Sequence, residues 1–195
     1  MTPLAKLLHS GRIPRVIGFD DAPFDRAAGS PVPISGIVCA GTRFEGMVWG
    51  RATRDGNDAT DVILALLRDS KFHAQVHAVL VDGLAVGGFN LIDLPRLSTE
   101  LERPVVAVMR RPPDVDAVRA VLARFDDADR RLALLEAAGP IHTEQGFTFQ
   151  CHGAEVDVVA ALLDRLTDRG RVPEPLRLAH LIGSAVVLGQ SGRRA

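Results

Sequence analysis

Hydrophobic positions in the first quarter of the chain fall into three short runs, separated by polar segments or by segments rich in glycine and proline. The runs cover residues 15–20, 34–40 and 44–51, and each has the length and apolar content of a β-strand. Only residues 41–43 separate the second run from the third, and so short a connection requires antiparallel pairing. We therefore predict an antiparallel meander of three strands, in which the loop 22–33 joins the first strand to the second.

From residue 57 onward the pattern changes to an alternation of helices and strands. Apolar runs at 78–82 and 104–109 indicate two buried strands, and residues 147–152 are a candidate for a last short strand. The spacing of apolar residues predicts helices at 60–68, 94–101, 115–124, 127–138, 155–168 and 175–188. Because strands joined across a helix normally lie parallel, we predict one α/β domain over residues 1–195. Its mixed five-stranded sheet has an antiparallel meander, then parallel crossovers, and is flanked by helices.

Composition narrows the class of protein only slightly. Of the 195 residues 47% are hydrophobic, enough for a sizeable core, and 23 basic against 24 acidic side chains leave a net charge near zero. That balance neither indicates nor excludes a nucleic-acid partner, because a basic patch can lie within a neutral total. The chain shows no signal peptide and no apolar run long enough to span a bilayer, and Cys39 and Cys151 lack metal-ligand spacing. We therefore expect a cytoplasmic protein with no membrane partner.

Two of the apolar strands end in an aspartate: VIGFD ends at Asp20 and AVLVD ends at Asp82. If these strands are parallel neighbours, both carboxylates lie at the same sheet edge, roughly 5 Å apart. Like charges at that separation repel unless a cation lies between them, and oxygen ligands suit Mg²⁺ or Mn²⁺. Such an ion can activate water and stabilise charge on a phosphoryl oxygen. The alternative is that each aspartate only caps the turn after its own strand.

Asp58 and His180 are the other candidate ligands, and both also have simpler explanations. Asp58 lies in the acidic segment RDGNDATD, where it either reaches the sheet edge as a third ligand or caps the following helix. His180 lies in the apolar segment RVPEPLRLAHLIGSAVVLG, whose Pro175 fits the first turn of a helix. His180 is a hydrogen-bonded core residue unless that helix packs on the acidic edge of the sheet.

Five segments taken together resemble a known family. They are VIGFDDAPF, DGNDAT, VLVDGLAVGGFN, PVVAVMRRPPD and PEPLRLAHLI. The set resembles the relatives of endonuclease V known as domain of unknown function 99, within the ribonuclease H-like superfamily, and covers nearly the whole chain. The resemblance implies a ribonuclease H-like fold, in agreement with the meander and crossovers predicted above. It also implies an endonuclease that cuts DNA or RNA near deaminated bases, with Mg²⁺ or Mn²⁺ held by acids on the sheet.

The resemblance gives four residues a role in catalysis and metal binding. Asp20 matches the aspartate of the first strand, and Asp82 matches the aspartate of the family's Asp-Gly turn. His180 falls where the family has a histidine or aspartate after its Pro-Glu-Pro segment. Asp58 stands in for the family's second acid, by a looser match. We expect these four side chains to bind the metal ion and to orient the attacking water.

Three further residues are expected to bind substrate. Arg110 and Arg111 follow the strand PVVAVM, and the guanidinium fork matches the oxygens of a phosphate group. Asn90 ends the glycine-rich loop, residues 83–90. In the reaction that the resemblance implies, water displaces the 3′ oxygen in line and leaves a 5′ phosphate.

Two other functions compete with the nuclease. Endonuclease V has a lysine where this chain has Arg110, and its aromatic wedge is not evident here, which favours a nucleic-acid-binding or regulatory protein with impaired catalysis. A phosphoacceptor domain also places an acid pair, here Asp20 and Asp21, after its first strand. Such a domain has a wholly parallel sheet and a helix directly after the acid pair, whereas this chain has a proline- and glycine-rich stretch there.

Overall fold

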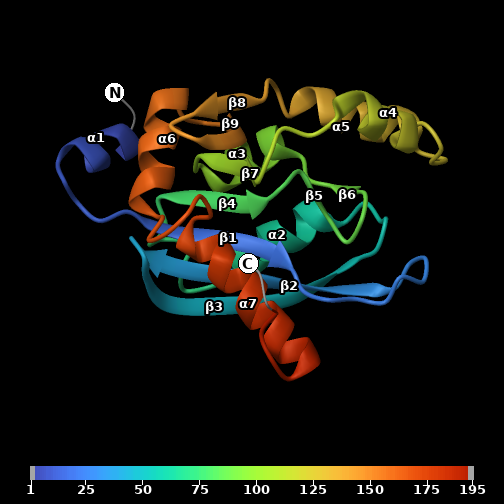
Figure 1. Ribbon diagram of the computed structural model, residues 1–195, viewed down its shortest axis with the longest axis horizontal. Helices are drawn as coiled ribbons and strands as arrows, with labels where there is room; N and C mark the ends of the chain where they lie inside the picture. The colour runs from blue at the N-terminus through green and yellow to red at the C-terminus, as the bar shows by residue number, and fades with distance from the viewer. Residues whose placement is uncertain (1–2, 193–195) are drawn as a thin grey trace.

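One seven-stranded mixed sheet organises residues 3–192, the part of the chain that this computed structural model describes (Figure 1). Across the sheet the strands are β3 (Arg43–Thr53), β2 (Pro31–Ala40), β1 (Arg15–Asp21), β4 (Ala78–Asp82), β7 (Val105–Met109), β9 (Phe147–His152) and β8 (His142–Glu144). A separate two-stranded ribbon pairs β5 (Ala85–Val86) with β6 (Asn90–Leu91). The helices are α1 (Pro3–His9), α2 (Ala59–Arg68), α3 (Leu94–Leu101), α4 (Val115–Leu122), α5 (Ala128–Ala137), α6 (Val156–Arg165) and α7 (Glu174–Leu188).

The predicted meander and crossovers are confirmed. Strands β1, β2 and β3 pair antiparallel in sequence order. Strand β4 then pairs parallel with β1, and β7 pairs parallel with β4 after the crossover through α3. The direct antiparallel connection from β1 to β2 also excludes the wholly parallel sheet that a phosphoacceptor domain requires.

The sheet is two strands larger than the five that we expected. Strand β9, a candidate from its sequence, pairs antiparallel with β7, and β8 adds to its outer side. Strand β8 has only three residues, and its turn to β9 uses positive φ angles at Gln145 and Gly146. Helix α1 was not expected either, because its seven residues are too few to show a helical pattern. Both elements depend on their neighbours rather than on local sequence.

The two faces of the sheet bury separate cores. Along β4, Val79 and Val81 point into the core beneath α2 and α3, whereas Ala78 and Leu80 point into the core beneath α1 and α6. A strand covered on both faces reads as a continuous apolar run. Burying one valine or leucine side chain contributes roughly 1.5–3 kcal/mol to the stability of the fold, so these apolar runs stabilise the sheet strongly. In residues 3–192, no helix has the length and apolarity needed to cross a membrane.

Helix α7 crosses the sheet over β1 and β2, and Figure 1 shows it in red against these two strands. Glycines allow this close approach: a Cβ built on Gly18 would come 2.7 Å from the Cβ of Pro175, and one on Gly183 would come 3.0 Å from the Cβ of Ala22. Pro175 lies in the first turn of α7, where its ring costs no helical hydrogen bond. The helix is therefore held against the end of β1 at which Asp20 lies.

Candidate functional site

Asp20 and Asp82 lie side by side at the carboxyl ends of two parallel strands. Phe19 pairs with Val81 in the register of β1 and β4, so the next residue of each strand is an aspartate. Because side chains alternate along a strand, both aspartates point to the face opposite to Phe19 and Val81. Asp20 is only 7% exposed, whereas Asp82 is partly open to solvent. The strand ends thus bring two carboxylates to one place at the protein surface.

His180 joins this pair from the other side. Its Nδ1 lies 3.2 Å from Oδ2 of Asp20, at hydrogen-bonding distance. The imidazole is partly exposed, with 32% of its side chain accessible. Helix α7 therefore packs on the sheet edge that carries the aspartates, which is the condition under which His180 is a candidate ligand and not only a core residue. We call Asp20, Asp21, Asp82 and His180 together the acidic edge.

Burial and mutual repulsion disfavour charge on Asp20. Removal from water raises the pKa of Asp20 to about 8, with further upward contributions from the charges of Asp82 and Asp21. The positive charge of Arg110 acts in the opposite direction. Without a cation, Asp20 therefore holds a proton at neutral pH.

The pKa values of Asp21 and Asp82 are also raised, chiefly by burial. Two effects oppose burial at Asp21: a hydrogen bond from the backbone N–H of Gly87, at 2.6 Å, and the charge of His180. At Asp82 the opposing charges are those of Arg110 and His180. Three carboxyl groups with raised pKa values at one edge form a site at which added positive charge is stabilising.

The donor set of the acidic edge fits a hard divalent cation. Within residues 3–192, no three His, Cys, Asp or Glu side chains come together as a ready-made metal cage. Magnesium does not need one, because it keeps several waters and is commonly held by one or two carboxylates together with substrate phosphates. Asp20 and Asp82 can supply two such carboxylates, and a cation beside them would relieve the repulsion that raises the pKa of Asp20.

Arg110 and Arg111 lie beside this edge, directly after β7. They line an open cavity of about 650 Å³ that also includes Asp82. Both arginine side chains are exposed. This arrangement places cationic groups next to the strand-end carboxylates, where a phosphate could be held by guanidinium hydrogen bonds.

Asp58 does not lie with the acidic edge. Its oxygens accept hydrogen bonds from the backbone N–H and the hydroxyl of Thr53, at 3.0 and 2.8 Å, and from Nδ2 of Asn90, at 2.6 Å. Burial alone would raise the pKa of Asp58, but these hydrogen bonds outweigh it and the net pKa is lowered. Asp58 precedes α2 without a side-chain bond to the first turn of that helix. Its carboxylate therefore links the end of β3 to Asn90. This role differs from both expectations for Asp58, which were a metal ligand and a helix cap.

Asn90 also differs from its expected role in substrate binding. It is fully buried, with 0% exposure. Its Oδ1 accepts from the backbone N–H of Ala59 at 3.1 Å, and its Nδ2 donates to the carbonyl of Thr53 as well as to Asp58. A buried amide with these partners has a structural task, which is to attach the glycine-rich loop to α2 and β3. The sequence showed the loop but not the direction of this side chain.

The glycine-rich loop is fixed by three charged residues that sequence reasoning did not select. Asp21 accepts from the N–H of Gly87, as described, and Asp55 accepts from the N–H of Phe89 at 2.9 Å. Arg131, a 4% exposed residue of α5, donates to the carbonyls of Asp55 and Phe89. The only sequence signal for these contacts was the acid pair at residues 20–21, because the partners are far apart in the chain.

Similar proteins share this fold and much of the sequence. The family model described as endonuclease dU matches residues 12–187. A UPF0215 protein of Deinococcus radiodurans is 39% identical over 181 residues, which cover 92% of this chain and 92% of that protein. A UPF0215 protein of Methanothermobacter thermautotrophicus is 37% identical over 182 residues, covering 91% of this chain and 89% of the relative.

Solved structures confirm the ribonuclease H-like fold and the resemblance to endonuclease V. A crystal structure of a protein of unknown function from Archaeoglobus fulgidus gives a TM-score of 0.84 at 34% identity, covering 89% of this chain and 98% of that chain. The catalytic domain of human endonuclease V gives 0.60 at 16% identity, with coverages of 97% and 89%. Ciona intestinalis endonuclease V, in complex with a 24mer DNA containing an inosine followed by a ribo-adenosine, gives 0.58 at 14%, with coverages of 92% and 87%.

Proposed function

This chain belongs to the endonuclease dU family, and from that premise we propose that it is a divalent-metal-dependent endonuclease acting on DNA or RNA. Its reaction is hydrolysis of a phosphodiester bond at a deaminated base. The observation that carries the proposal is the convergence of Asp20, Asp82 and His180 at one partly open sheet edge, next to two exposed arginines. Neither a structural turn nor a helix cap requires this combination.

Asp20 and Asp82 are the residues that would hold Mg²⁺ or Mn²⁺. When bound, such an ion lowers the pKa of water and stabilises charge on a phosphoryl oxygen. His180 keeps the carboxylate of Asp20 oriented through its Nδ1. Asp58 is not included in this ligand set, because its oxygens are engaged by Thr53 and Asn90.

The other groups of the chain bind the substrate and manage the proton. Arg110 and Arg111 contact the phosphate through their guanidinium groups. With no cation present, Asp20 holds a proton, because burial and the neighbouring carboxylates raise its pKa to about 8, and positive charge beside Asp20 would favour release of that proton. The hydrolysis that this site would carry out is an in-line displacement of the 3′ oxygen by water, leaving a 5′ phosphate.

The names of the family and of one structural neighbour support a deaminated base in the substrate. The family is described as endonuclease dU, and deoxyuridine is the nucleotide that deamination of cytosine leaves in DNA. The DNA bound to the Ciona endonuclease contains inosine, whose base is the deamination product of adenine. The two bases share the chemical change of an amino group into a carbonyl group.

A cleavage assay with matched oligonucleotides tests the proposal. The full chain is incubated with Mg²⁺ or Mn²⁺ and end-labelled DNA or RNA that contains one uracil, one hypoxanthine or only ordinary bases. Asp82→Asn is compared with Asp164→Asn, which changes an exposed carboxylate on α6. We expect cleavage by the wild type and by Asp164→Asn, and a loss of at least about 100-fold in Asp82→Asn. Equal cleavage by both variants would contradict the assignment of the site.

The second candidate is a nucleic-acid-binding protein without efficient catalysis. The observation that favours it is Arg110, whose guanidinium stays charged and does not donate a proton near neutral pH. The same oligonucleotides distinguish the two functions when their binding is measured by fluorescence anisotropy. Binding without any metal-dependent product identifies this second function.

A further inference from the structure

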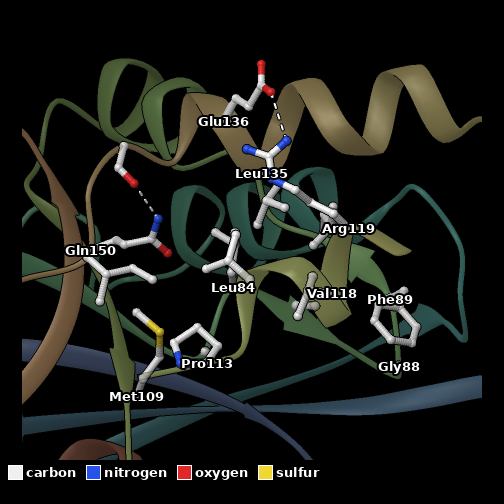
Figure 2. Close-up of a pocket in the computed structure, with 16 residues that line it drawn as sticks. Leu84, Gly88, Phe89, Met109, Pro113, Val118, Arg119, Leu135, Glu136 and Gln150 are labelled. Atoms are coloured by element: carbon white, nitrogen blue, oxygen red, sulfur yellow. Dashed lines mark hydrogen bonds and ion pairs between the residues drawn. The ribbon is translucent and has the colours of Figure 1, made fainter. Parts of the chain in front are cut away.

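Ser35 is an exception among the buried polar side chains, most of which are paired. Gln150 of β9, for example, is 4% exposed at the wall of a largely apolar cavity of about 580 Å³, and its Nε2 donates to the carbonyl of Gly139 at 2.7 Å (Figure 2). Within residues 3–192, only two buried side-chain N or O atoms lack a hydrogen-bond partner, Oγ of Ser35 and Nε2 of His73. His73 precedes the amino end of β4, whereas Ser35 lies on β2, between β1 and β3. A buried hydroxyl without a partner is unfavourable, so the surroundings of Ser35 require an explanation.

The side chain of Ser35 lies directly beside that of Asp20. The two residues are partners in the antiparallel register of β1 and β2, so their side chains extend from the same face of the sheet. The Cβ atoms of directly opposed residues are roughly 5 Å apart, a gap that a serine hydroxyl and a carboxylate can span with one hydrogen bond. Both side chains are enclosed, with exposures of 0% for Ser35 and 7% for Asp20. The unpaired hydroxyl is therefore within reach of a carboxylate of the acidic edge.

The other residues that flank Ser35 offer it no side-chain acceptor. On the opposite side of β2, its partner in the register is Trp49 of β3, whose indole N–H can only donate. Above the sheet lies Gly183 of α7, where an added Cβ would come 3.7 Å from the Cβ of Ser35. Glycine has no side chain with which to accept a hydrogen bond. Of the two cross-strand neighbours of Ser35, only Asp20 can therefore accept from its hydroxyl.

The carboxylate of Asp20 has room for this additional donor. Nδ1 of His180 lies 3.2 Å from its Oδ2. His180 and Gly183 are one turn apart on α7, so the helix covers Asp20 with an imidazole and Ser35 with backbone alone. A carboxylate has about four lone-pair sites, and the imidazole nitrogen and a divalent ion would use two of them. Asp20 can therefore accept a hydrogen bond from Ser35 and still hold an ion.

We propose that Ser35 is a positioning residue for Asp20: its hydroxyl donates to the carboxylate when Asp20 binds the divalent ion, and this bond keeps the carboxylate from turning. The terminal torsion of an aspartate has a broad energy well, and His180 contacts only one of the two oxygens. Hydrogen bonds to the side chains that bind a metal ion orient those side chains and raise the affinity for the metal. The inference rests on the proposed metal-dependent function, and it adds a residue of β2 that is not part of the acidic edge.

Metal affinity and stability in the absence of metal separate a positioning role from a packing role. The full-length wild type, Ser35→Ala and Ser184→Ala are titrated with Mn²⁺ by calorimetry, and their melting temperatures are measured in EDTA. We expect Ser35→Ala to lose about 10- to 100-fold in affinity for Mn²⁺. Its melting temperature in EDTA is expected to be no lower than that of the wild type, because Oγ has no hydrogen bond in the fold to lose.

Ser184→Ala is the matched control, and Ser35→Thr is the second variant. Ser184 is a serine of α7 that is 3% exposed, but it is not paired with Asp20 in the sheet, so its replacement is expected to leave the affinity for Mn²⁺ unchanged. Ser35→Thr keeps the hydroxyl and is expected to keep the affinity too. Wild-type affinity in Ser35→Ala overturns the proposal. Equal losses in the two Ser35 variants overturn it as well, because they assign the effect to packing.

The same measurements distinguish this inference from the nuclease function. Cleavage that depends on Asp82, together with unchanged Mn²⁺ affinity in Ser35→Ala, overturns the role of Ser35 and leaves the nuclease function standing. A wild type that binds Mn²⁺ with an affinity that depends on Ser35, but cuts no oligonucleotide, supports the role of Ser35 and overturns the nuclease function. A wild type that binds no Mn²⁺ overturns both.

Discussion

Gly18 of β1 and Pro175 of α7 are in such close contact that a methyl group at Gly18 has no room. The added Cβ would come 2.7 Å from the Cβ of Pro175 and 2.8 and 2.9 Å from backbone atoms of Pro175 and Leu176. Because backbone atoms do not move aside as a side chain does, the contact sets the height of α7 above the sheet. It therefore also sets the 3.2 Å separation between His180 and Asp20.

Gly18→Ala is expected to lower the free energy of unfolding by about 1–3 kcal/mol, the usual cost of overpacking a core. The helix would have to move away from β1, and metal-dependent cleavage is expected to fall with the displacement of His180. Urea denaturation and the cleavage assay measure the two effects. A variant as stable as the wild type would show that the helix is not held by this contact.

The pH dependence of stability follows from the pKa of Asp20. In the folded protein this pKa is about 8, against an ordinary value of 3.8, so the folded state binds a proton that the unfolded state has released between these values. Stability in EDTA is therefore expected to fall as pH rises through this window, by at most about 1.4 kcal/mol per pH unit. Asp20→Asn removes this contribution, and the difference between the two proteins from pH 5.5 to 8.5 isolates it. Curves that run parallel over this range would contradict a proton on Asp20.

Divalent cations are expected to stabilise the protein, because under the proposed function they would bind the folded acidic edge and not the unfolded chain. At a Mn²⁺ concentration of 100 times the dissociation constant, the gain is about 2.7 kcal/mol. The gain should increase with pH, since Mn²⁺ competes with the proton on Asp20. Thermal melting measures it, with Asp82→Asn expected to lose the effect and Asp164→Asn to keep it. Equal stabilisation of the two variants would place the ion elsewhere.

Asp58→Ala tests whether the carboxylate of Asp58 has a structural role or binds the metal ion. We expect a loss of roughly 1–3 kcal/mol in stability, because Asn90 and Thr53 lose their acceptor in a partly buried setting. The affinity for Mn²⁺, measured by calorimetry on the folded variant, is expected to stay within about threefold of the wild type, since Asp58 is not in the acidic edge. A tenfold loss of affinity would restore Asp58 to the ligand set.

Arg131→Met tests the anchoring of the glycine-rich loop. The variant keeps the aliphatic volume but leaves the carbonyls of Asp55 and Phe89 without their donor, so we expect a loss of roughly 2–3 kcal/mol. Amide exchange in residues 83–90 should become faster than in the sheet. The control is Arg130→Met, at the exposed neighbouring arginine, which is expected to change stability by less than about 0.5 kcal/mol.

Local patterns predicted most of the fold, and the elements that they did not predict share one cause. The short connection at residues 41–43 and the apolar runs of β1, β4 and β7 were sufficient to predict the meander and the parallel crossovers, because chain length and periodicity constrain them directly. Strand β8 and helix α1 are short and gain their stability from pairing with β9 and packing near α6. No pattern within three or seven residues contains that information.

The candidate site likewise contains residues that the sequence could place and residues that it could not. The sequence by itself determined that Asp20 and Asp82 lie at the carboxyl ends of two strands, because a strand-end residue is placed by the strand. That these strands are parallel neighbours was a condition, and the structure meets it. It did not determine where side chains from loops point: Asp58 and Asn90 face each other, Arg131 fixes the loop, and Gln150 reaches the cavity only through the sheet. These directions come from contacts between residues far apart in the chain. Only the tertiary structure decided them, since hydrogen bonds and close packing act between neighbours in space.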